Sequence, residues 1–273
     1  MLNNFTVLIS IYKNNSLIDI VKLIKSIKTQ TLYPSEIIII YDGLVKSDIK
    51  LLISKLKNVK IISNIKNLGH GASLKKGVLA SKFPVIIRCD ADDINLPGRF
   101  KILYKTFLNN RSLDVIGSFL EEYNNQTRFF RNLPTKNSTI KILLPYRNCI
   151  NHPTVLLKKK TVLRAGNFEA CRNFEDYFLW LKMSKINAIF LNIPKIYVKS
   201  YVDAKFYKRR GGIHYFKDYK SFMTKSLKFE LINKLQFIIN ISIRYIIQNI
   251  QTKWLRIFYN IILRKRVAIN TKM

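Results

Sequence analysis

Asp90, Asp92 and Asp93 place three carboxylates within four residues of a chain that has only 16 acidic residues. Carboxylates this close repel one another unless a cation or hydrogen bonds compensate them. Hard cations such as Mg²⁺ or Mn²⁺ bind carboxylate oxygens and keep positions open for phosphate oxygens. The cluster therefore predicts a divalent metal site, although a capped turn that begins a helix near Pro97 would use the same residue types.

Other acids stand where they could take part in chemistry. Asp42 follows an apolar run and precedes Gly43, so it is either a ligand contact or an ordinary turn residue. Glu175 and Asp176 open a segment with helical periodicity. A carboxylate there could act as a general base, and two acids at a helix start would equally complement the helix dipole.

His152 and the glycines Gly69 and Gly71 are weaker signals. His152 could contact a phosphate or a metal, and a structural histidine is equally consistent with its place before Pro153. The glycine pair lacks the G-x-G-x-x-G spacing and no Walker lysine follows it, so we expect a tight turn there.

The three cysteines are an odd number with long gaps between them, and no C-x-x-C occurs: Cys89, Cys149 and Cys171. This usage argues against a disulfide framework or a zinc ribbon and favours a reducing cytosol. We expect Cys89, beside the acidic cluster, to be a small buried apolar residue rather than a ligand. The sequence before Tyr12 shows no signal-peptide pattern.

Short apolar runs alternate with helical periodicity in the first part of the chain. We expect strands at residues 5–11, 36–41, 59–63 and 84–88, and helices at residues 17–30, 48–56 and from the glycine turn through Ala80. Strands this apolar are typical of a mostly parallel sheet covered by helices on both faces. Asp42 and the acidic cluster then fall at carboxyl ends of strands, where open α/β sheets bind ligands.

The following residues are less regular. They favour strands at residues 112–119, 151–157 and 190–198, and a helix at residues 176–186.

The 273 residues carry 48 Lys and Arg against 16 acids, a formal charge of +32. A hydrophobic share of 48% excludes a disordered polycation. Binding to nucleic acid would favour arginine-rich stripes and a known motif, whereas the basic residues are 34 Lys and 14 Arg and no such motif occurs. We keep nucleic-acid binding as an alternative and expect no nucleic-acid partner.

Residues 205–273 hold 16 basic and two acidic residues, +14 in all. One face of an expected helix carries Lys253, Arg256, Asn260 and Arg264, the other carries Trp254 and Phe258, and Lys265 and Arg266 follow. A basic amphipathic helix suits the surface of an anionic membrane, although a helical pair packed on the rest of the chain is also consistent. We therefore divide the chain into a catalytic domain at 1–204 and a basic helical tail at 205–273.

Four segments, taken in order, suggest a family. VLISIYKNN, IKTQTLYPSEIIIIYDG and NLGHGASLKKGVLASKFPVIIRCDADDINLPGRF resemble the nucleotide-sugar-binding half of inverting family 2 glycosyltransferases of the GT-A fold. INHPTVLLKKKTVLRAGNFEACRNFEDYFLWLKM resembles their acceptor half, and the combination is most similar to the amylovoran-biosynthesis-like branch. The resemblance covers roughly residues 5–200.

The resemblance implies a role for each matching position. It implies that Ser10 and Asp42 contact the uridine, and that Asp90 and Asp92, with Asp93 following, form the D-x-D motif that holds the metal and the diphosphate. It implies that Asp176 is the catalytic base, with Glu175 beside it. Asn151 and His152 match a segment that would contact the acceptor or the diphosphate. The chain departs from many relatives at Tyr41, Lys13 and Gly98. These departures leave open which nucleotide base and which sugar the chain recognises.

The implied activity is transfer of one sugar from a UDP-sugar to a lipid-diphosphate-linked saccharide, with inversion and with Mg²⁺ or Mn²⁺. It belongs to the synthesis of bacterial O-antigen, capsule or exopolysaccharide at the cytoplasmic face of the membrane. A sugar-1-phosphate nucleotidyltransferase is an alternative, but it would need a glycine-rich loop where Ile11–Asn15 has no glycine. A non-catalytic homologue would not be expected to keep these acids.

Overall fold

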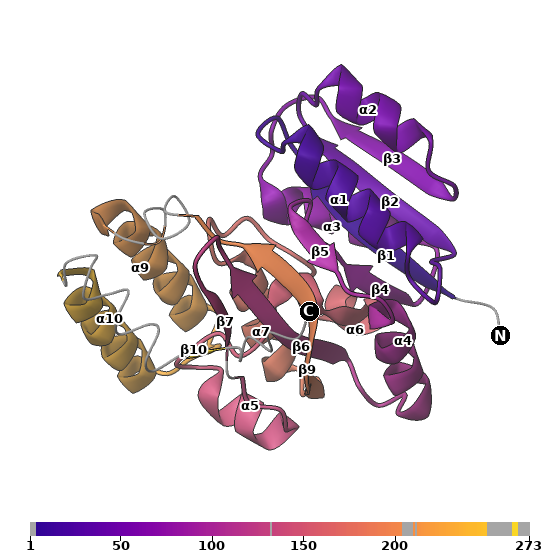
Figure 1. Cartoon of the computed structure of the whole chain (residues 1–273). Helices are drawn as coiled ribbons and strands as arrows, with labels where there is room; N and C mark the ends of the chain where they lie inside the picture. The colour runs from indigo at the N-terminus through magenta and orange to yellow at the C-terminus, as the bar shows by residue number, and fades with distance from the viewer. Residues whose placement is uncertain (1–3, 132, 204–209, 211, 250–263, 267–273) are drawn as a thin grey trace.

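The computed structural model describes residues 4–131, 133–203, 210, 212–249 and 264–266. These residues form a mixed α/β structure in which helices flank one large sheet (Figure 1). The strands are β1 Phe5–Ile11, β2 Glu36–Asp42, β3 Val59–Asn64, β4 Val85–Arg88, β5 Asp93–Asn95, β6 Val115–Tyr123, β7 Arg128–Arg131, β8 Leu156–Lys158, β9 Phe190–Tyr201 and β10 Arg264–Arg266.

The helices follow the alternation expected in the first half of the chain and continue beyond it. They are α1 Leu17–Lys28, α2 Ser47–Ser54, α3 His70–Ala80, α4 Arg99–Asn109, α5 Asn137–Leu143, the 3₁₀ turn η1 His152–Thr154, α6 Lys159–Arg164, α7 Glu175–Lys185, α9 Gly212–Lys228 and α10 Lys234–Asn249. No helix among them is long and apolar enough to cross a membrane.

The expected parallel sheet is confirmed in the first half of the chain. The strands β4, β1, β2 and β3 lie side by side in this order and every pair of neighbours is parallel. Their carboxyl ends therefore meet at one edge, which gathers the residues that follow Ile11, Asp42, Asn64 and Arg88. Any ligand of these four turns binds at the same place.

Both faces of this sheet are buried, as the apolar strands predict. Within β1, Leu8 packs in a core with the α3 and α7 side of the sheet, whereas Val7 and Ile9 pack in a second core with α1, α2 and α4. Because successive side chains of a strand point to opposite faces, an unbroken apolar run needs cover on both sides.

The second half of the chain extends the sheet with antiparallel pairs. Strand β8 joins β4 to β6, both antiparallel, and β6 then pairs with β7 antiparallel and with β9 parallel. The short strand β5 lies off this path and pairs with β9. This pairing places the acidic turn after β4 against a strand from the second half.

The structure corrects one expectation about the tail. Arg264, Lys265 and Arg266 form β10, antiparallel to β7, so Arg264 is not on a helix. The helical expectation for Lys253, Trp254, Arg256, Phe258 and Asn260 falls outside the described residues. The described part of the tail is otherwise helical, in α9 and α10.

A glycine allows α3 to approach the start of α7. A Cβ on Gly71 would lie 2.6 Å from the carbonyl oxygen of Glu169 and 3.1 Å from Cβ of Glu175. Such distances force something to shift, because one neighbour is backbone. Gly71 therefore sets how closely the donor half of the sheet meets the α7 helix.

We predict that Gly71→Ala lowers the free energy of unfolding by about 1–3 kcal/mol, the usual cost of overpacking. Helix propensity alone would stabilise the same substitution by up to about 1 kcal/mol, so the sign of the change separates the two effects. Urea unfolding measures it, and a midpoint that rises would contradict the close approach described above.

Candidate active site

Asp42 is buried at the end of β2 and organises the loop that opens α3. Its Oδ1 accepts hydrogen bonds from the backbone N–H of Leu68 at 2.8 Å and from Nδ2 of Asn64 at 3.0 Å. Its Oδ2 accepts one from the N–H of Gly69 at 3.1 Å. Gly69 has φ +87°, a conformation that glycine adopts at no steric cost. Both carboxylate oxygens are thus used in shaping the loop before α3. The tight turn expected at Gly69 and Gly71 is instead the start of this helix, with Gly69 as its N-cap.

Ser10 lies at the same edge of the sheet. It is buried near the end of β1 and is in register with Ile40 of β2, two residues before Asp42. The structure therefore places the two predicted uridine contacts on neighbouring strands. Their contact with a nucleotide stays a prediction.

Arg88 ends β4 and is buried beneath the acidic turn, with 1% of its side chain exposed. Its guanidinium forms an ion pair with Asp90, lies 3.0 Å from Nε2 of His70, and donates to the carbonyl oxygen of Leu8 at 3.2 Å. Burial acts to raise the pKa of Asp90, but the charge of Arg88 outweighs it and the pKa is lowered. Asp90 is therefore ionised and held in place.

The other two acids of the cluster are less well compensated. Asp92 is exposed, yet partial loss of solvent and the nearby Asp90 carboxylate raise its pKa to about 6. Asp93 is buried in β5, where burial and the charges of Asp90 and Asp92 raise its pKa well above the usual range despite a hydrogen bond from Ser200. The turn thus carries more carboxylate than the surrounding protein neutralises.

This arrangement fits a divalent cation that is shared with a ligand. Among the described residues, no three His, Cys, Asp or Glu side chains come together as a complete metal site. Asp90 and Asp92 nevertheless offer hard oxygen ligands, and the raised pKa of Asp92 marks negative charge that a cation would compensate. An incomplete set of protein ligands suits Mg²⁺ or Mn²⁺, which often takes its remaining ligands from phosphate oxygens and water.

Arg99 fastens the acidic turn to the second half of the chain. It is fully buried, and its Nη2 donates to the carbonyl oxygens of Arg88 and Pro153, each at 2.7 Å. Its Nη1 donates to Asn95 and to Sγ of Cys89. Cys89 is buried and free, as expected. The bond to Pro153 connects the acidic cluster with the N-H-P-T segment.

Two neutral histidines line the same region. The rings of His70 and His152 lie 5.6 Å apart, edge to face. Burial, reinforced by the charge of Arg88, lowers the pKa of His70 to about 4 and that of His152 well below its usual range. The buried Nε2 of His152 has no hydrogen-bond partner among the described residues. At neutral pH the two rings can accept or donate hydrogen bonds without adding charge.

Asn151 has a structural task beside His152. Its Nδ2 donates to the carbonyl oxygen of Ser118 at 3.2 Å, and its Oδ1 accepts from Nη1 of Arg131 at 3.1 Å. These bonds tie η1 to β6 and β7. Contact of Asn151 with an acceptor or a diphosphate stays a prediction.

Glu175 and Asp176 occupy the first turn of α7, where acids complement the helix dipole. Oδ2 of Asp176 accepts a hydrogen bond from Nδ2 of Asn148 at 3.0 Å, whereas the buried Oε2 of Glu175 has no hydrogen-bond partner among the described residues. Burial raises the pKa of both acids, and the neighbouring Asp176 helps to raise that of Glu175 to about 7. Such a pair can hold and release a proton near neutral pH.

The structure thus gathers part of the predicted site directly. Asp90, His70 and His152 lie around Arg88, and Gly71 brings Glu175 against the start of α3. Sequence reasoning missed Arg88, Arg99 and Asn148. A signal existed for Arg88, because an arginine that closes an apolar strand two residues before an aspartate has a counter-ion within reach.

Comparisons with known proteins agree on one family. The model of glycosyl transferase family 2 matches residues 6–166. A UDP-Gal:alpha-D-GlcNAc-diphosphoundecaprenol beta-1,3-galactosyltransferase of Escherichia coli is 30% identical, over 96% of this chain and 97% of that protein. The amylovoran biosynthesis glycosyltransferase AmsE of Erwinia amylovora is 29% identical, over 78% of this chain and 82% of that protein.

Solved structures agree on the fold. TarS of S. aureus, residues 1–349 in complex with UDP-GlcNAc, has a TM-score of 0.64 at 16% identity, covering 88% of this chain and 72% of that one. The mannosyltransferase PcManGT from Pyrobaculum calidifontis, in complex with GDP-Man and Mn²⁺, has a TM-score of 0.61 at 13% identity, covering 92% and 71%. The GT-A fold that the sequence predicted is therefore confirmed.

We predict that Glu175→Gln stabilises the protein at about pH 8 and leaves its stability unchanged below about pH 4. The folded pKa of about 7 lies above the usual value of 4.5, so the folded state binds a proton that the unfolded state loses between these values. Ionised Glu175 then costs folding on the order of 2 kcal/mol above pH 7, and the amide removes that cost.

Urea unfolding of the ligand-free protein across this pH range measures the difference. Glu230→Gln is the control, because Glu230 is 86% exposed and should give the same curve as the unmodified protein at every pH. A Glu175→Gln protein that is less stable than the unmodified one at pH 8 would contradict the cost of burying a carboxylate whose Oε2 has no hydrogen-bond partner among the described residues.

Proposed function

This chain belongs to glycosyl transferase family 2, and from that membership we propose that it transfers one sugar, with inversion, from a UDP-sugar to a hydroxyl of a lipid-diphosphate-linked saccharide. The proposal is carried by one observation: the contact of Gly71 with Glu175 sets the acid pair of α7 beside the α3 start that flanks the acidic cluster. A general base and a diphosphate site on facing elements are what an inverting transfer needs.

The substrates are proposed from the relatives and from the donor set of the site. The E. coli relative is named for a UDP-Gal donor and a GlcNAc-diphosphoundecaprenol acceptor, and it aligns over nearly the whole of both chains. The amylovoran relative is named for the synthesis of a polysaccharide. We propose that this chain takes part in the assembly of a bacterial O-antigen, capsule or exopolysaccharide repeat.

The chain's own residues would divide the task as follows. Ser10 and Asp42 would contact the uridine. Asp90, fixed by Arg88, would hold a divalent cation together with Asp92 and Asp93, and through it the diphosphate. A divalent cation bound there would neutralise the charge that builds up on the leaving UDP.

Asp176 would take the proton of the attacking acceptor hydroxyl. Its raised pKa makes it a stronger base than a free carboxylate, and the bond from Asn148 orients one of its oxygens. Glu175, whose pKa is raised to about 7 in part by the charge of Asp176, would act beside it as a second proton carrier. Asn151 and the neutral His152 would contact the acceptor or the diphosphate without adding positive charge.

The place of action follows from the acceptor. A lipid-diphosphate carrier is held in a membrane, so we propose that the enzyme works peripherally at the cytoplasmic face. The proposed division is a catalytic domain at 1–204 and a basic tail at 205–273 that reaches this surface.

We predict that Asp176→Asn folds normally and loses about 10²–10⁴-fold in turnover, the usual worth of general-base catalysis. UDP release is measured with UDP-Gal, UDP-Glc, UDP-GlcNAc and UDP-GalNAc and a water-soluble GlcNAc-diphosphate short-chain alkyl acceptor. Asp48→Asn is the matched control, because Asp48 also stands in the first turn of a helix. Near-normal turnover in Asp176→Asn would remove this residue as the base.

We predict that EDTA abolishes transfer and that Mg²⁺ or Mn²⁺ restores it. Calorimetry gives an independent readout, since the metal should bind with UDP present and should lose at least tenfold in affinity when Asp92 becomes Asn. Full activity after thorough chelation, together with no metal binding in the presence of UDP, would exclude the metal role of the acidic cluster.

A further inference from the structure

We infer that the hairpin of α9 and α10, residues 212–249, is the surface through which this enzyme docks on an anionic phospholipid membrane. The inference rests on the proposed function to the extent that a lipid-linked acceptor brings the enzyme to a membrane. It assigns the docking to described helices, upstream of the segment where the sequence placed it. The two helices lie side by side (Figure 1).

The helix α10 has its polar groups on the inside. Asn240 is buried, donates to the carbonyl oxygen of Pro145 at 2.9 Å and accepts from the hydroxyl of Tyr219 at 3.1 Å. The guanidinium of Arg244 lies 4.4 Å from the ring centre of Tyr215 on α9. The face of α10 that packs on the protein is thus satisfied by hydrogen bonds and a cation–π contact.

The outward face of α10 is apolar. Its exposed apolar side chains, with exposed fractions between 53% and 64%, are Leu235, Ile238, Ile243, Tyr245 and Ile246, and Lys234 is exposed at the start of the helix. Leu235, Ile238 and Ile246 recur at helical spacing, with Ser242 between them, and no acidic residue occurs in the helix. An apolar stripe of this kind on a surface marks an interaction site.

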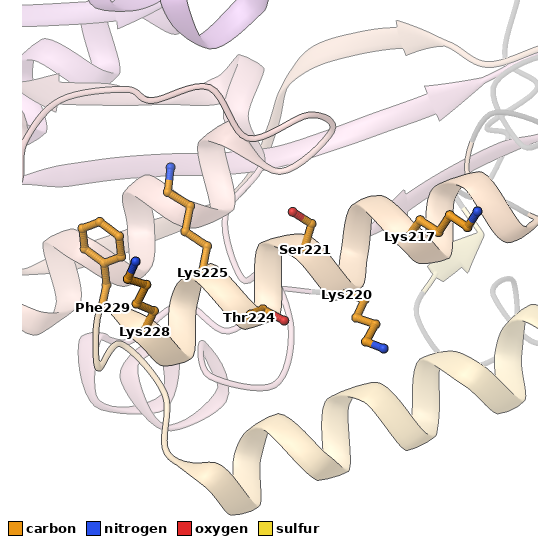
Figure 2. A pocket seen from close by; sticks show the side chains of 7 residues that line it. All are labelled: Lys217, Lys220, Ser221, Thr224, Lys225, Lys228 and Phe229. Carbon is orange, nitrogen blue, oxygen red and sulfur yellow. The ribbon is translucent and has the colours of Figure 1, made fainter.

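The neighbouring helix α9 presents positive charge. Lys217, Lys220, Thr224 and Lys228 lie along its exposed side and help to line an open hollow of about 590 Å³ (Figure 2). Lys225 of the same hollow is held instead by Glu169, at 2.9 Å between Nζ and Oε2. Phe229, 45% exposed, ends the hollow at the turn between the two helices.

Charge favours a lipid surface over a second copy of this chain. Two copies that met through this hairpin would bring like-charged lysine rows together, whereas anionic headgroups attract them and acyl chains accept the isoleucines. The acids near the row are engaged: Asp218 with Asn173 at 2.8 Å, and Glu230 with Lys185 at 3.2 Å. The rest of residues 205–273 adds further positive charge.

The hairpin is also joined to the catalytic helix. Phe174, the residue before Glu175, stacks on Phe222 of α9 with 5.0 Å between ring centres, and it meets Tyr215 and Tyr219 of the same helix edge to face. A membrane that holds α9 therefore also fixes the start of α7. Docking through this surface would orient the proposed base toward a lipid-borne acceptor.

Flotation of the full-length protein with vesicles tests the inference. The vesicles are phosphatidylcholine alone or phosphatidylcholine with 30% phosphatidylglycerol (roughly the anionic share that gives a bacterial-like surface potential). We expect binding to the anionic vesicles only. A triple variant, Lys217→Gln with Lys220→Gln and Lys228→Gln, should lower that binding by on the order of 100-fold. Each lost charge is expected to lower the binding constant by about one order of magnitude or less.

A second variant removes the apolar stripe. Ile238→Gln with Ile246→Gln should lower binding at least tenfold, because two side chains that enter the headgroup boundary become polar. Its matched control is Leu51→Gln with Leu79→Gln, whose side chains are 63% and 57% exposed against 62% and 58% for Ile246 and Ile238. The control for the lysines is Lys22, Lys25 and Lys28→Gln, three exposed lysines on α1.

Each possible result either supports the docking surface or overturns it. Unchanged vesicle binding in both hairpin variants overturns the inference, and so does a dimer in light scattering that Ile238→Gln with Ile246→Gln converts to a monomer. UDP release with the water-soluble acceptor should be unchanged in both variants, while transfer to a long-chain acceptor in vesicles falls. An enzyme that transfers sugar but never floats refutes only the docking surface, and one that floats but transfers nothing refutes only the proposed function.

Discussion

The buried ion pair of Arg88 and Asp90 is the constraint on which the rest of the site depends. A guanidinium inside an apolar strand is costly unless its hydrogen bonds and its charge are satisfied. Asp90, His70 and backbone carbonyls pair the two terminal nitrogens of Arg88, while its Nε has no hydrogen-bond partner among the described residues. These bonds restrict the conformation of the turn after β4. The neutral state of both histidines follows in part from the same charge, because Arg88 disfavours a second cation beside it. Of the other two acids, Asp93 is buried with a hydrogen bond from Ser200, and Asp92 is exposed at the edge of the sheet.

A second set of contacts connects the same region to α7, the helix that begins with Glu175 and Asp176. Glu169 accepts from Lys182 of α7 at 2.6 Å and from Lys225 of α9 at 2.9 Å, and its carbonyl oxygen faces Gly71 of α3. Glu169 thus contacts three helices: α3, α7 with its pair of acids, and α9 of the hairpin. Two cations on one carboxylate lower its pKa against the effect of burial and so favour the ionised form of Glu169.

The sequence was enough to predict what local pattern encodes. The apolar runs at 5–11 and 36–41 became β1 and β2 with at most one residue of difference, because strands buried on both faces need unbroken apolar side chains. The role of Asp42 in the Gly69 loop could not be predicted, since its partners are some 22 to 27 residues away along the chain. The strand at Arg264–Arg266 depends on pairing with β7, far away in the sequence, and helical spacing gave no sign of it.

Distance explains how a chain of charge +32 can keep a site that depends on a few acids. At physiological ionic strength a charge is screened within about 8 Å, so a lysine row on α9 acts on the surface that it touches and hardly on the far turn of β4. The pKa of Asp90 is set accordingly by burial and by Arg88, and that of Asp92 by burial and by Asp90. What connects the two regions is packing, through Phe174 and Phe222, and not the electrostatic field. The basic surface and the acidic site can therefore change independently in charge as long as the aromatic contact between α7 and α9 is kept.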